Sequence, residues 1–328
     1  MHAPDGFLEP WVAGFTALLA GVVLARAVKA SAHELGDRSV PLAGVCAAFI
    51  FAAQMLNFPV VSGTSGHLLG GALAAILLGP WAGSLVVAVV VVVQALMFAD
   101  GGLTALGYNT LNMAIVPAFG GWALFRGFRR LLPDNGGGVV GASGLAAGVS
   151  VVLAAMAFSL QWLFGATAPV PFDTVFGAMV GVHLLIGIGE GVITGLVVAA
   201  VVATRPDLVV GVADVTPSRL AHQPRVGART FIIAGLLFAI FLATTMSQLT
   251  SGDPDGLERV AIDQGFADSG SEHAFADGVF AEYATRGLDN ERMSVAIAGG
   301  AGVALTLIVG SGLVSAQRRL SFADASTS

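Results

Sequence analysis

Cysteine and lysine are almost missing from this sequence, which has one residue of each, Cys46 and Lys29, among 328. A single cysteine excludes a disulfide framework and a thiolate metal cluster. A phosphate-binding Walker loop ends in Lys-Ser or Lys-Thr, whereas Ala30 follows the only lysine. The chain is therefore not a P-loop ATPase, and any ATP-driven step must be supplied by a partner.

Charged residues are also scarce. They make up 11% of the chain, against roughly 25% in soluble domains, and hydrophobic residues make up 55%. Long apolar runs recur from end to end, which is typical of membrane-spanning helices. We expect an all-α polytopic membrane protein with about nine spans, surrounded by lipid and without a nucleic-acid partner. The expected spans are 11–28, 42–56, 68–78, 81–98, 106–125, 140–164, 175–203, 231–246 and 295–314.

Basic residues predict the orientation of these spans. Arginine and lysine gather in four clusters, at 26–29, 126–130, 205–229 and 318–319. The alternate loops near 57–67, 99–105 and 165–174 contain neither residue. Because basic loops stay in the cytoplasm, we expect a protein of the cytoplasmic membrane with its N-terminus outside and its C-terminus inside.

The chain begins with the segment Met1-His2-Ala3-Pro4-Asp5-Gly6-Phe7, which we call the hook. The Met1 amine, the His2 amide nitrogen and the His2 ring nitrogen form a compact chelate. Pro4 has a fixed φ and Asp5-Gly6 is a turn pair, so the hook is expected to be stiff and to turn its amine inward. The alternative is a frayed terminus with a chance histidine.

His67 opens a span on the same side of the membrane as the hook, after a loop of small residues. A histidine at this depth is usually an interfacial or packing residue, but convergence with the hook would bring four nitrogens together. Nitrogen ligands in a square plane suit Ni(II) or Cu(II). Three further residues are candidates for groups that orient the imidazoles: Asp5, Ser62 and Ser65.

Other polar residues stand at membrane depth. Four of them surround the loop 99–105 in the outer half: Gln94, Asp100, Asn109 and Asn112. They line a route for metal, or they cap helices and join them by hydrogen bonds. His183 and Glu190 are seven residues apart and share a helical face. An ionisable residue in a span is a functional candidate, and a structural hydrogen bond between helices explains the pair equally well.

Two further features concern packing and charge. Small residues recur at four-residue spacing in Gly44, Ala48 and Ala52, which indicates close helix packing within the bundle or a face for a partner. Residues 250–292 hold ten of the 21 acidic residues and three arginines. Composition favours a solvated loop there, and the alternative is an outer cap that attracts cations. We expect it to assist metal loading without supplying primary ligands.

These residues resemble those of a known family. The hook is similar to a Met-His-x-Pro-Asp-Gly start, and further matches are 62–67, the loop 99–103 with Asn109 and Asn112, and His183 through Glu190-Gly191. The family is CbiM/NikM, the substrate-specific membrane components of energy-coupling factor (ECF) transporters for cobalt and nickel. Pro254-Asp255-Gly256-Leu257-Glu258 resembles the PDGLE domain, a counterpart of the small CbiN/NikN subunits. Position 3 departs from the family, which often has isoleucine there.

The resemblance implies a metal site built on Met1, His2 and His67, with Ni²⁺ or Co²⁺ as transported ligand and no resident cofactor. It implies a CbiM/NikM-like domain at 1–205, a cytoplasmic linker at 206–228 and a PDGLE domain at 229–328. The expected partners are a transmembrane coupling component and two cytoplasmic ATPases. In this family the first span is added to a six-helix core, so the docking face is expected on Gly44, Ala48 and Ala52.

Two classes of function remain open on this basis. The leading interpretation is a metal-uptake component that binds and transports but catalyses no reaction. The alternative is a membrane metalloenzyme that uses Glu190 as a general base. Against the enzyme, Glu190 and the outer histidines are expected at different depths, and no motif places a base beside a metal-bound water.

Overall fold

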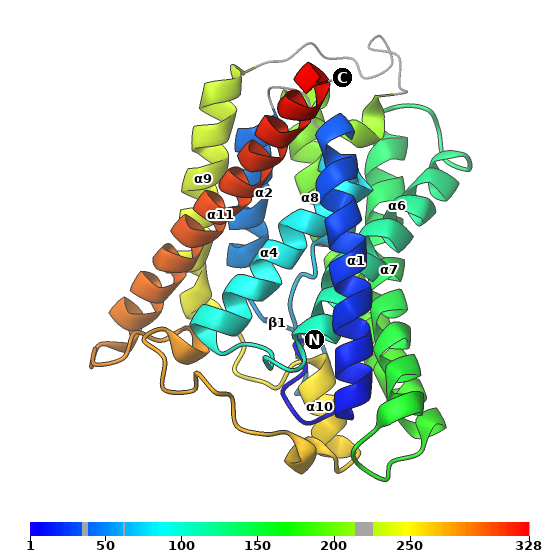
Figure 1. Ribbon diagram of the computed structural model, residues 1–328, viewed down its shortest axis with the longest axis vertical. Helices are drawn as coiled ribbons and strands as arrows, with labels where there is room; N and C mark the ends of the chain where they lie inside the picture. The colour runs from blue at the N-terminus through cyan, green and yellow to red at the C-terminus, as the bar shows by residue number, and fades with distance from the viewer. Residues whose placement is uncertain (35–38, 62, 214–225, 328) are drawn as a thin grey trace.

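The computed structural model describes residues 1–34, 39–61, 63–213 and 226–327 as an all-helical bundle (Figure 1). Ser62 lies outside the described residues. The α-helices are α1 Pro10–Glu34, α2 Ser39–Gln54, α3 Gly71–Leu78, α4 Pro80–Phe98, α5 Leu106–Asn109, α6 Val116–Arg129, α7 Gly136–Gly165, α8 Phe172–Thr204, α9 Ala228–Thr244, α10 Gly256–Asp263 and α11 Glu291–Thr327. The short elements are β1 Phe58–Pro59, β2 Ser65–Gly66, the π-helix η1 Thr110–Ile115, and the 3₁₀ turns η2 Pro206–Leu208, η3 Val210–Val212, η5 Met246–Leu249, η6 Ala267–Ser269 and η7 Ala281–Tyr283.

Each of the nine expected apolar segments contains a helix, although residues 68–70 of the third are not helical. In the described part of the chain, six helices are long and apolar enough to cross a membrane, and a shorter apolar helix covers 41–54. Exposed aliphatic and aromatic side chains lie along the outside of these helices, for example Phe15, Leu18 and Val22 in α1. Apolar side chains of this kind are stable in contact with lipid. The chain is therefore a multi-pass membrane protein, as the hydropathy predicts.

The third expected span, already short at 68–78, begins three residues later in the structure. Helix α3 has eight residues, which extend ~12 Å, whereas the hydrocarbon core is ~30 Å thick. Residues 64–70 before it are buried and non-helical, and Gly70 has a positive φ of 78°. The chain therefore enters the bundle as extended backbone before α3 begins. Hydropathy cannot tell the extended residues 68–70 from the helix that follows, because the residues of both are apolar and buried.

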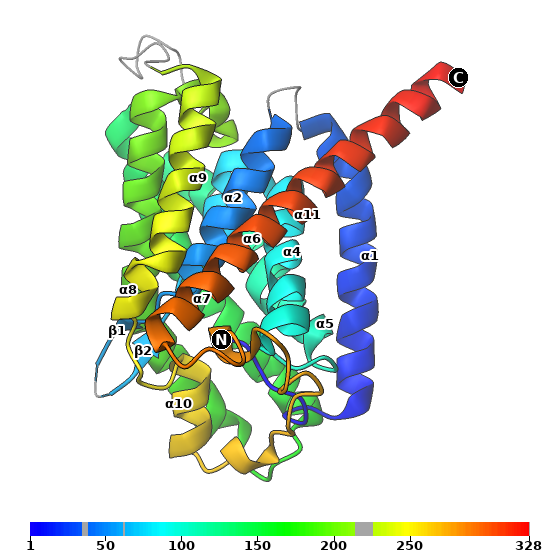
Figure 2. The same cartoon turned by 90° about the vertical axis from the view of Figure 1, so that its left-hand side faces the viewer.

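The loops that matter for function gather at one end of the bundle. Figures 1 and 2 show the N-terminus, α5, the β1–β2 ribbon and α10 together at this end, whereas the C-terminal end of α11 lies at the other. The ribbon pairs Phe58 with Gly66 and Pro59 with Ser65. The hook is not frayed, because Met1, Ala3 and Phe7 are all buried. We call this end of the molecule the hook end.

The small-residue ladder of α2 is covered within the chain, which corrects the expectation of a free docking face. Helix α11 crosses α2 diagonally and packs along it (Figure 2). A Cβ added at Gly44 would clash with Ser311 and lie 3.0 Å from the Leu307 carbonyl oxygen. Ala48 and Ala52 are fully buried. Small residues allow close approach but do not specify the partner, and here α11 is the partner of Gly44.

Candidate metal centre

The hook is held in place by side chains of the segment that leads into η1. Asn109 clamps Ala3 through two hydrogen bonds: its Oδ1 accepts from the Ala3 N–H and its Nδ2 donates to the Ala3 carbonyl, both at 2.9 Å. The Tyr108 hydroxyl donates to the Pro4 carbonyl oxygen at 3.0 Å. These contacts satisfy buried backbone groups that cannot reach water. They fix the path of the chain directly after His2.

Asp5 ties the hook to the loop 99–105. Its carboxylate accepts from the N–H groups of Leu103 at 3.1 Å and Thr104 at 2.6 Å. Asp5 does not contact an imidazole in these bonds, so the expectation that it orients one is replaced by an anchoring role. Gly102 lies so close to Asp5 that a side chain there would collide with it.

Glu190 supports the extended stretch that carries His67. Its two carboxylate oxygens accept from the Leu69 N–H at 2.6 Å and the Gly70 N–H at 2.9 Å. Gln54 donates from Nε2 to the Leu69 carbonyl oxygen at 2.8 Å. Backbone without helical hydrogen bonds is tolerated at membrane depth only when protein groups satisfy it. Both oxygens of Glu190 have this task, which corrects its interpretation as a general base.

His67 presents one ring nitrogen to the hook. Its Nδ1 lies 3.0 Å from the Leu68 carbonyl oxygen, which only accepts, so Nδ1 carries the proton. The lone pair of Nε2 then faces the Met1 nitrogen, 2.7 Å away. Two nitrogens bound side by side to one metal at about 2.0–2.1 Å, at right angles, are ~2.9 Å apart. The pair therefore stands at nearly the spacing of adjacent ligands in a square plane.

The His2 ring stacks beside that of His67, with ring centroids 5.2 Å apart. Its Nε2 lies 3.0 Å from the Gln94 Oε1, and its Nδ1 lies 3.2 Å from an Asp100 oxygen. Burial lowers the pKa of the His2 imidazole to about 4, although Asp100 acts to raise it. A neutral ring that donates to Gln94 keeps a lone pair on Nδ1, facing the Asp100 carboxylate. A cation between them would satisfy both groups.

The acidic segment reaches into this centre, which sequence reasoning missed. The Met1 amine donates to Asp255 Oδ2, which also lies 3.6 Å from His67 Nε2. Asp255 Oδ1 accepts from the N–H groups of Leu257 and Glu258, both at 2.9 Å, and so caps α10. Burial alone raises the pKa of the Asp255 carboxyl, but the Met1 ammonium and His67 outweigh it and hold this pKa well below its usual range.

The neighbours of Asp255 explain its position. Ser65 donates from its N–H to the Pro254 carbonyl at 2.9 Å and from its hydroxyl to the Asp253 carbonyl at 2.7 Å. Ser65 therefore anchors the acidic segment in these bonds and does not orient an imidazole as expected. A Cβ at Gly256 would lie 2.6 Å from the Ile186 side chain and 3.0 Å from the His183 ring, so glycine leaves room for both. The His183 Nδ1 lies 2.7 Å from the Met179 carbonyl oxygen, within hydrogen-bond distance in the same helix α8. The first part of the acidic segment, up to Phe266, thus packs on the bundle, whereas residues 267–292 are exposed or half-buried, as expected of a solvated loop.

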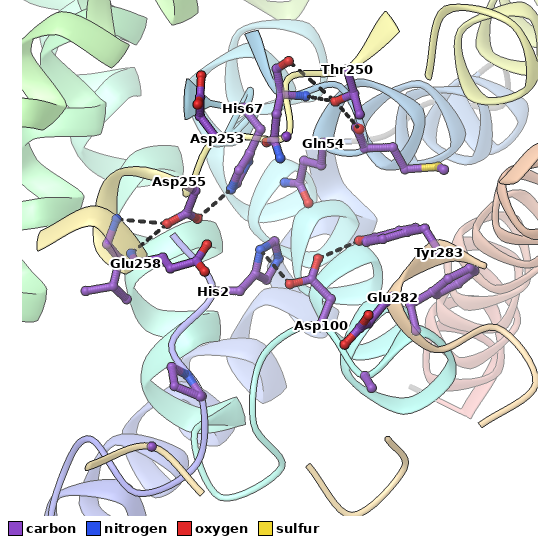
Figure 3. Close-up of a pocket in the computed structure, with 18 of the residues that line it drawn as sticks. His2, Gln54, His67, Asp100, Thr250, Asp253, Asp255, Glu258, Glu282 and Tyr283 are labelled. Carbon is purple, nitrogen blue, oxygen red and sulfur yellow. Dashed lines mark hydrogen bonds and ion pairs between the residues drawn. The ribbon is translucent and has the colours of Figure 1, made fainter. Parts of the chain in front are cut away.

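A large acidic cavity opens onto the centre. Its volume is about 1020 Å³, and His2, Gln54, His67 and Asp100 contribute to its wall (Figure 3). Seven carboxylates line it: Asp100, Asp253, Asp255, Glu258, Glu272, Glu282 and Glu291. No lysine or arginine occurs among the described residues of its lining. Asn109 and Asn112 are not part of it. Asn112 instead exchanges two hydrogen bonds with Gln161 in α7, at 2.9 and 2.7 Å, so only Asp100 of the three lies on the expected route for metal.

Side chains alone do not form a metal site here. Across the described ranges of the chain, no three side chains of histidine, cysteine, aspartate or glutamate are arranged to hold an ion. The Met1 amine and the His2 amide are the main-chain nitrogens adjacent to His2 and His67.

Comparison with known proteins identifies the family. The model of the cobalt uptake substrate-specific transmembrane region, CbiM, matches residues 2–208. The chain belongs to the CbiM family. Residues 229–319 match the PDGLE domain, so a CbiM region and a PDGLE domain are fused in one chain, as the sequence resemblance predicts.

Relatives of this CbiM-family chain are named for the transport of two metals. A fused protein of Archaeoglobus fulgidus, named NikMN for nickel transport, is 36% identical over 319 residues, which are 97% of this chain and 99% of that protein. The cobalt transport protein CbiM of Geobacter sulfurreducens is 30% identical over 281 residues, 83% of this chain and 79% of that protein. A crystal structure described as a transition metal transporter aligns with a TM-score of 0.54 and 34% identity, over 61% of this chain and 92% of that chain. None of these names describes an enzyme.

The role of Glu190 can be tested by removing its oxygens. In Glu190→Leu, the Leu69 and Gly70 N–H groups lose their acceptor, at a cost of about 1–3 kcal/mol for each group. We expect a lower midpoint of thermal unfolding in detergent and an intermediate value for Glu190→Gln, which keeps one acceptor oxygen. Asp173→Leu, at the exposed start of α8, is the control and should unfold as wild type does. A Glu190→Leu protein as stable as wild type would contradict the structural role.

Proposed function

We propose that this CbiM-family chain is the metal-binding membrane component of an ECF-type importer for Ni²⁺ or Co²⁺. The observation that carries the proposal is the convergence of the Met1 amine, His67 Nε2 and the His2 ring in a buried centre. The Met1 amine, the His2 amide, His2 Nδ1 and His67 Nε2 are the four ligands. A plane of four nitrogens suits nickel by ligand preference, and the relatives carry names for both metals, so both ions are proposed substrates.

The acidic cavity is the proposed route to this centre. Seven carboxylates without a lysine or arginine among the described lining residues create a negative potential that concentrates divalent cations. His2 and His67 both lie in the wall of the cavity, so an ion that enters it can reach their ring nitrogens (Figure 3). Nitrogen ligands then retain a transition metal in preference to Mg²⁺ or Ca²⁺, which favour oxygen.

The energy for transport is proposed to come from partners. The sequence holds no Walker lysine, so two cytoplasmic ATPases and a transmembrane coupling component are needed to drive import. In this arrangement residues 1–205 form the metal-binding membrane domain, 206–228 a cytoplasmic linker and 229–328 the PDGLE domain. The alternative function is a metalloenzyme with Glu190 as base. It is disfavoured because both Glu190 oxygens accept hydrogen bonds from the Leu69 and Gly70 N–H groups.

The hook end is proposed to face outside the cytoplasmic membrane. The core loops at this end lack arginine and lysine, whereas Arg126, Arg129 and Arg130 lie at the opposite end of the bundle. Single cysteines at Asp277 or Leu131, in a Cys46→Ala background, test the assignment, because both side chains are exposed and they lie at opposite ends. An impermeant thiol reagent added to intact cells should label position 277 and leave position 131 unmodified. The reverse pattern would overturn the orientation.

Metal binding should depend on the length of the hook. Adding one residue before Met1 moves the amine out of the centre and puts a peptide group in its place. His67→Ala removes one nitrogen and leaves the chelate of the hook. We expect the extension to lower the affinity for Ni²⁺ and Co²⁺ at least as much as His67→Ala does, because it removes the amine and disturbs its neighbours.

Calorimetric titration of Ni²⁺ and Co²⁺ into wild type, the extended protein, His2→Ala and His67→Ala measures these affinities. Intact mass determination of the purified protein shows whether Met1 is its first residue. His273→Ala is the control, because His273 lies in the acidic segment but not in the centre, and it should bind as wild type does. If the extended protein binds as tightly as wild type, the amine is not a ligand and the proposed centre is wrong.

A further inference from the structure

Asp255 is the point at which the C-terminal part of the chain contacts the proposed metal ligands. Its two oxygens have different partners: Oδ1 accepts the first N–H groups of α10, and Oδ2 accepts from the Met1 amine. The contact joins residues 254 positions apart in the chain. The carboxylate is 17% exposed at the side chain and faces the same space as His67 (Figure 3).

The position of this carboxylate is set on both sides. The Ser65 N–H holds the Pro254 carbonyl just before it. After it, α10 packs against α8 and buries Leu257, Val260 and Ala261 almost completely. A carboxylate held at both ends in this way cannot drift far from the amine. The Met1 nitrogen, by contrast, is the end of a chain whose first anchored backbone groups are those of Ala3.

We propose that Asp255 is a positioning residue of the metal centre: it accepts a hydrogen bond from the Met1 amine and thereby aims the amine lone pair at the metal. This inference rests on the proposed function. A primary amine that gives its lone pair to a metal still has two N–H groups, so the bond to Asp255 Oδ2 persists in the loaded state. Carboxylates that accept from metal-binding imidazoles act in the same way, by orienting the ligand and raising its basicity.

The arrangement favours positioning over direct ligation by Asp255. One of its oxygens is committed to the N-terminus of α10 and the other to the amine. His2, His67 and Asp255 are not arranged as a trio of side chains that holds an ion. The negative charge also offsets part of the charge of a divalent ion in a centre that is otherwise built from nitrogen. The PDGLE domain thus contributes a hydrogen-bond acceptor to a centre whose ligands all come from the CbiM region.

Asp255→Asn separates this role from the capping role. Asparagine is as good an N-cap as aspartate, so its side-chain oxygen still caps α10. Its side-chain NH₂ group then faces the Met1 amine, which needs a hydrogen-bond acceptor and no longer has one. Removal of such outer groups typically weakens metal affinity 10–100-fold, and we expect a loss of this size for Ni²⁺. The absorption bands of bound Ni²⁺ should also shift, because the amine no longer holds its place in the plane. Asp263→Asn removes one negative charge from the same helix outside the cavity lining, where Asp263 pairs with Arg259, and should leave affinity and spectrum unchanged.

The test uses the full-length protein in detergent, with Ni²⁺ affinity measured by competition against a chelator and thermal unfolding measured without metal. Asp255→Ser, a second variant that keeps the cap, should lose affinity as Asp255→Asn does. In the protein extended by one residue before Met1, Asp255→Asn should have no further effect, because the amine through which Asp255 acts is already displaced.

The outcomes are distinguishable. If wild type binds tightly, the extension weakens binding and Asp255→Asn binds as wild type does, the positioning role is wrong and the proposed function stands. If affinity falls in step with thermal stability in both Asp255 variants while the Ni²⁺ spectrum stays unchanged, Asp255 is only a structural cap, which also overturns the inference. If Asp255→Asn lowers the Ni²⁺ affinity by the same factor in the extended protein as in wild type, Asp255 does not act through the amine. Failure of the extension to affect wild-type binding would instead overturn the proposed function itself.

Discussion

Buried backbone groups in a membrane protein need hydrogen-bond partners within the protein, and this requirement shapes the hook end of the molecule. Two non-helical stretches, the hook and residues 64–70, enter the bundle there. Glu190 and Gln54 satisfy the second stretch, and Asn109 satisfies the first at Ala3. Both stretches are therefore held rigidly although neither is helical. Their rigidity is what brings the Met1 nitrogen to 2.7 Å from His67 Nε2.

Acidic residues line the cavity beside the nitrogens that these two stretches hold. The nitrogens lie at the inner wall of a cavity whose carboxylates come from both parts of the chain, Asp100 from the CbiM region and Glu258 among those from the PDGLE domain. Tyr283 joins the two parts again, because its hydroxyl donates to Asp100 at 2.5 Å. The acidic segment therefore encloses the approach to the centre, and through Asp255 it also contacts the amine. Fusion in one chain keeps the cavity wall and the centre together.

Much of this could be predicted from the sequence, and the limits have physical causes. The helices follow from apolar runs, and the hook follows from residues adjacent in the chain, whose geometry is local. The short third helix could be predicted, but not its start at Gly71, because residues 68–70 are as apolar in an extended stretch as in a helix. The ladder at Gly44 indicated close packing but not that α11 would cover it. Helix α10 was not predicted, because composition favours a solvated loop there, although Asp255 and Glu258 have the spacing of a helix N-terminus. The contact of Asp255 with Met1 depends on tertiary structure. The same holds for Glu190, whose partners are backbone groups that leave no trace in the sequence.

The central claim, that the Met1 amine binds the metal, can be measured without changing a single residue. Cu²⁺ accepts the same square-planar nitrogen ligands, and its electron paramagnetic resonance spectrum shows splitting from each directly bound nitrogen nucleus. Protein made with ¹⁵N-methionine carries the label on the backbone nitrogen of Met1, and among the described residues no other methionine nitrogen lies in the centre. We predict that this label changes the splitting by the replacement of one ¹⁴N ligand, and that ¹⁵N-histidine changes it further. A spectrum that is identical with and without labelled methionine would contradict the account.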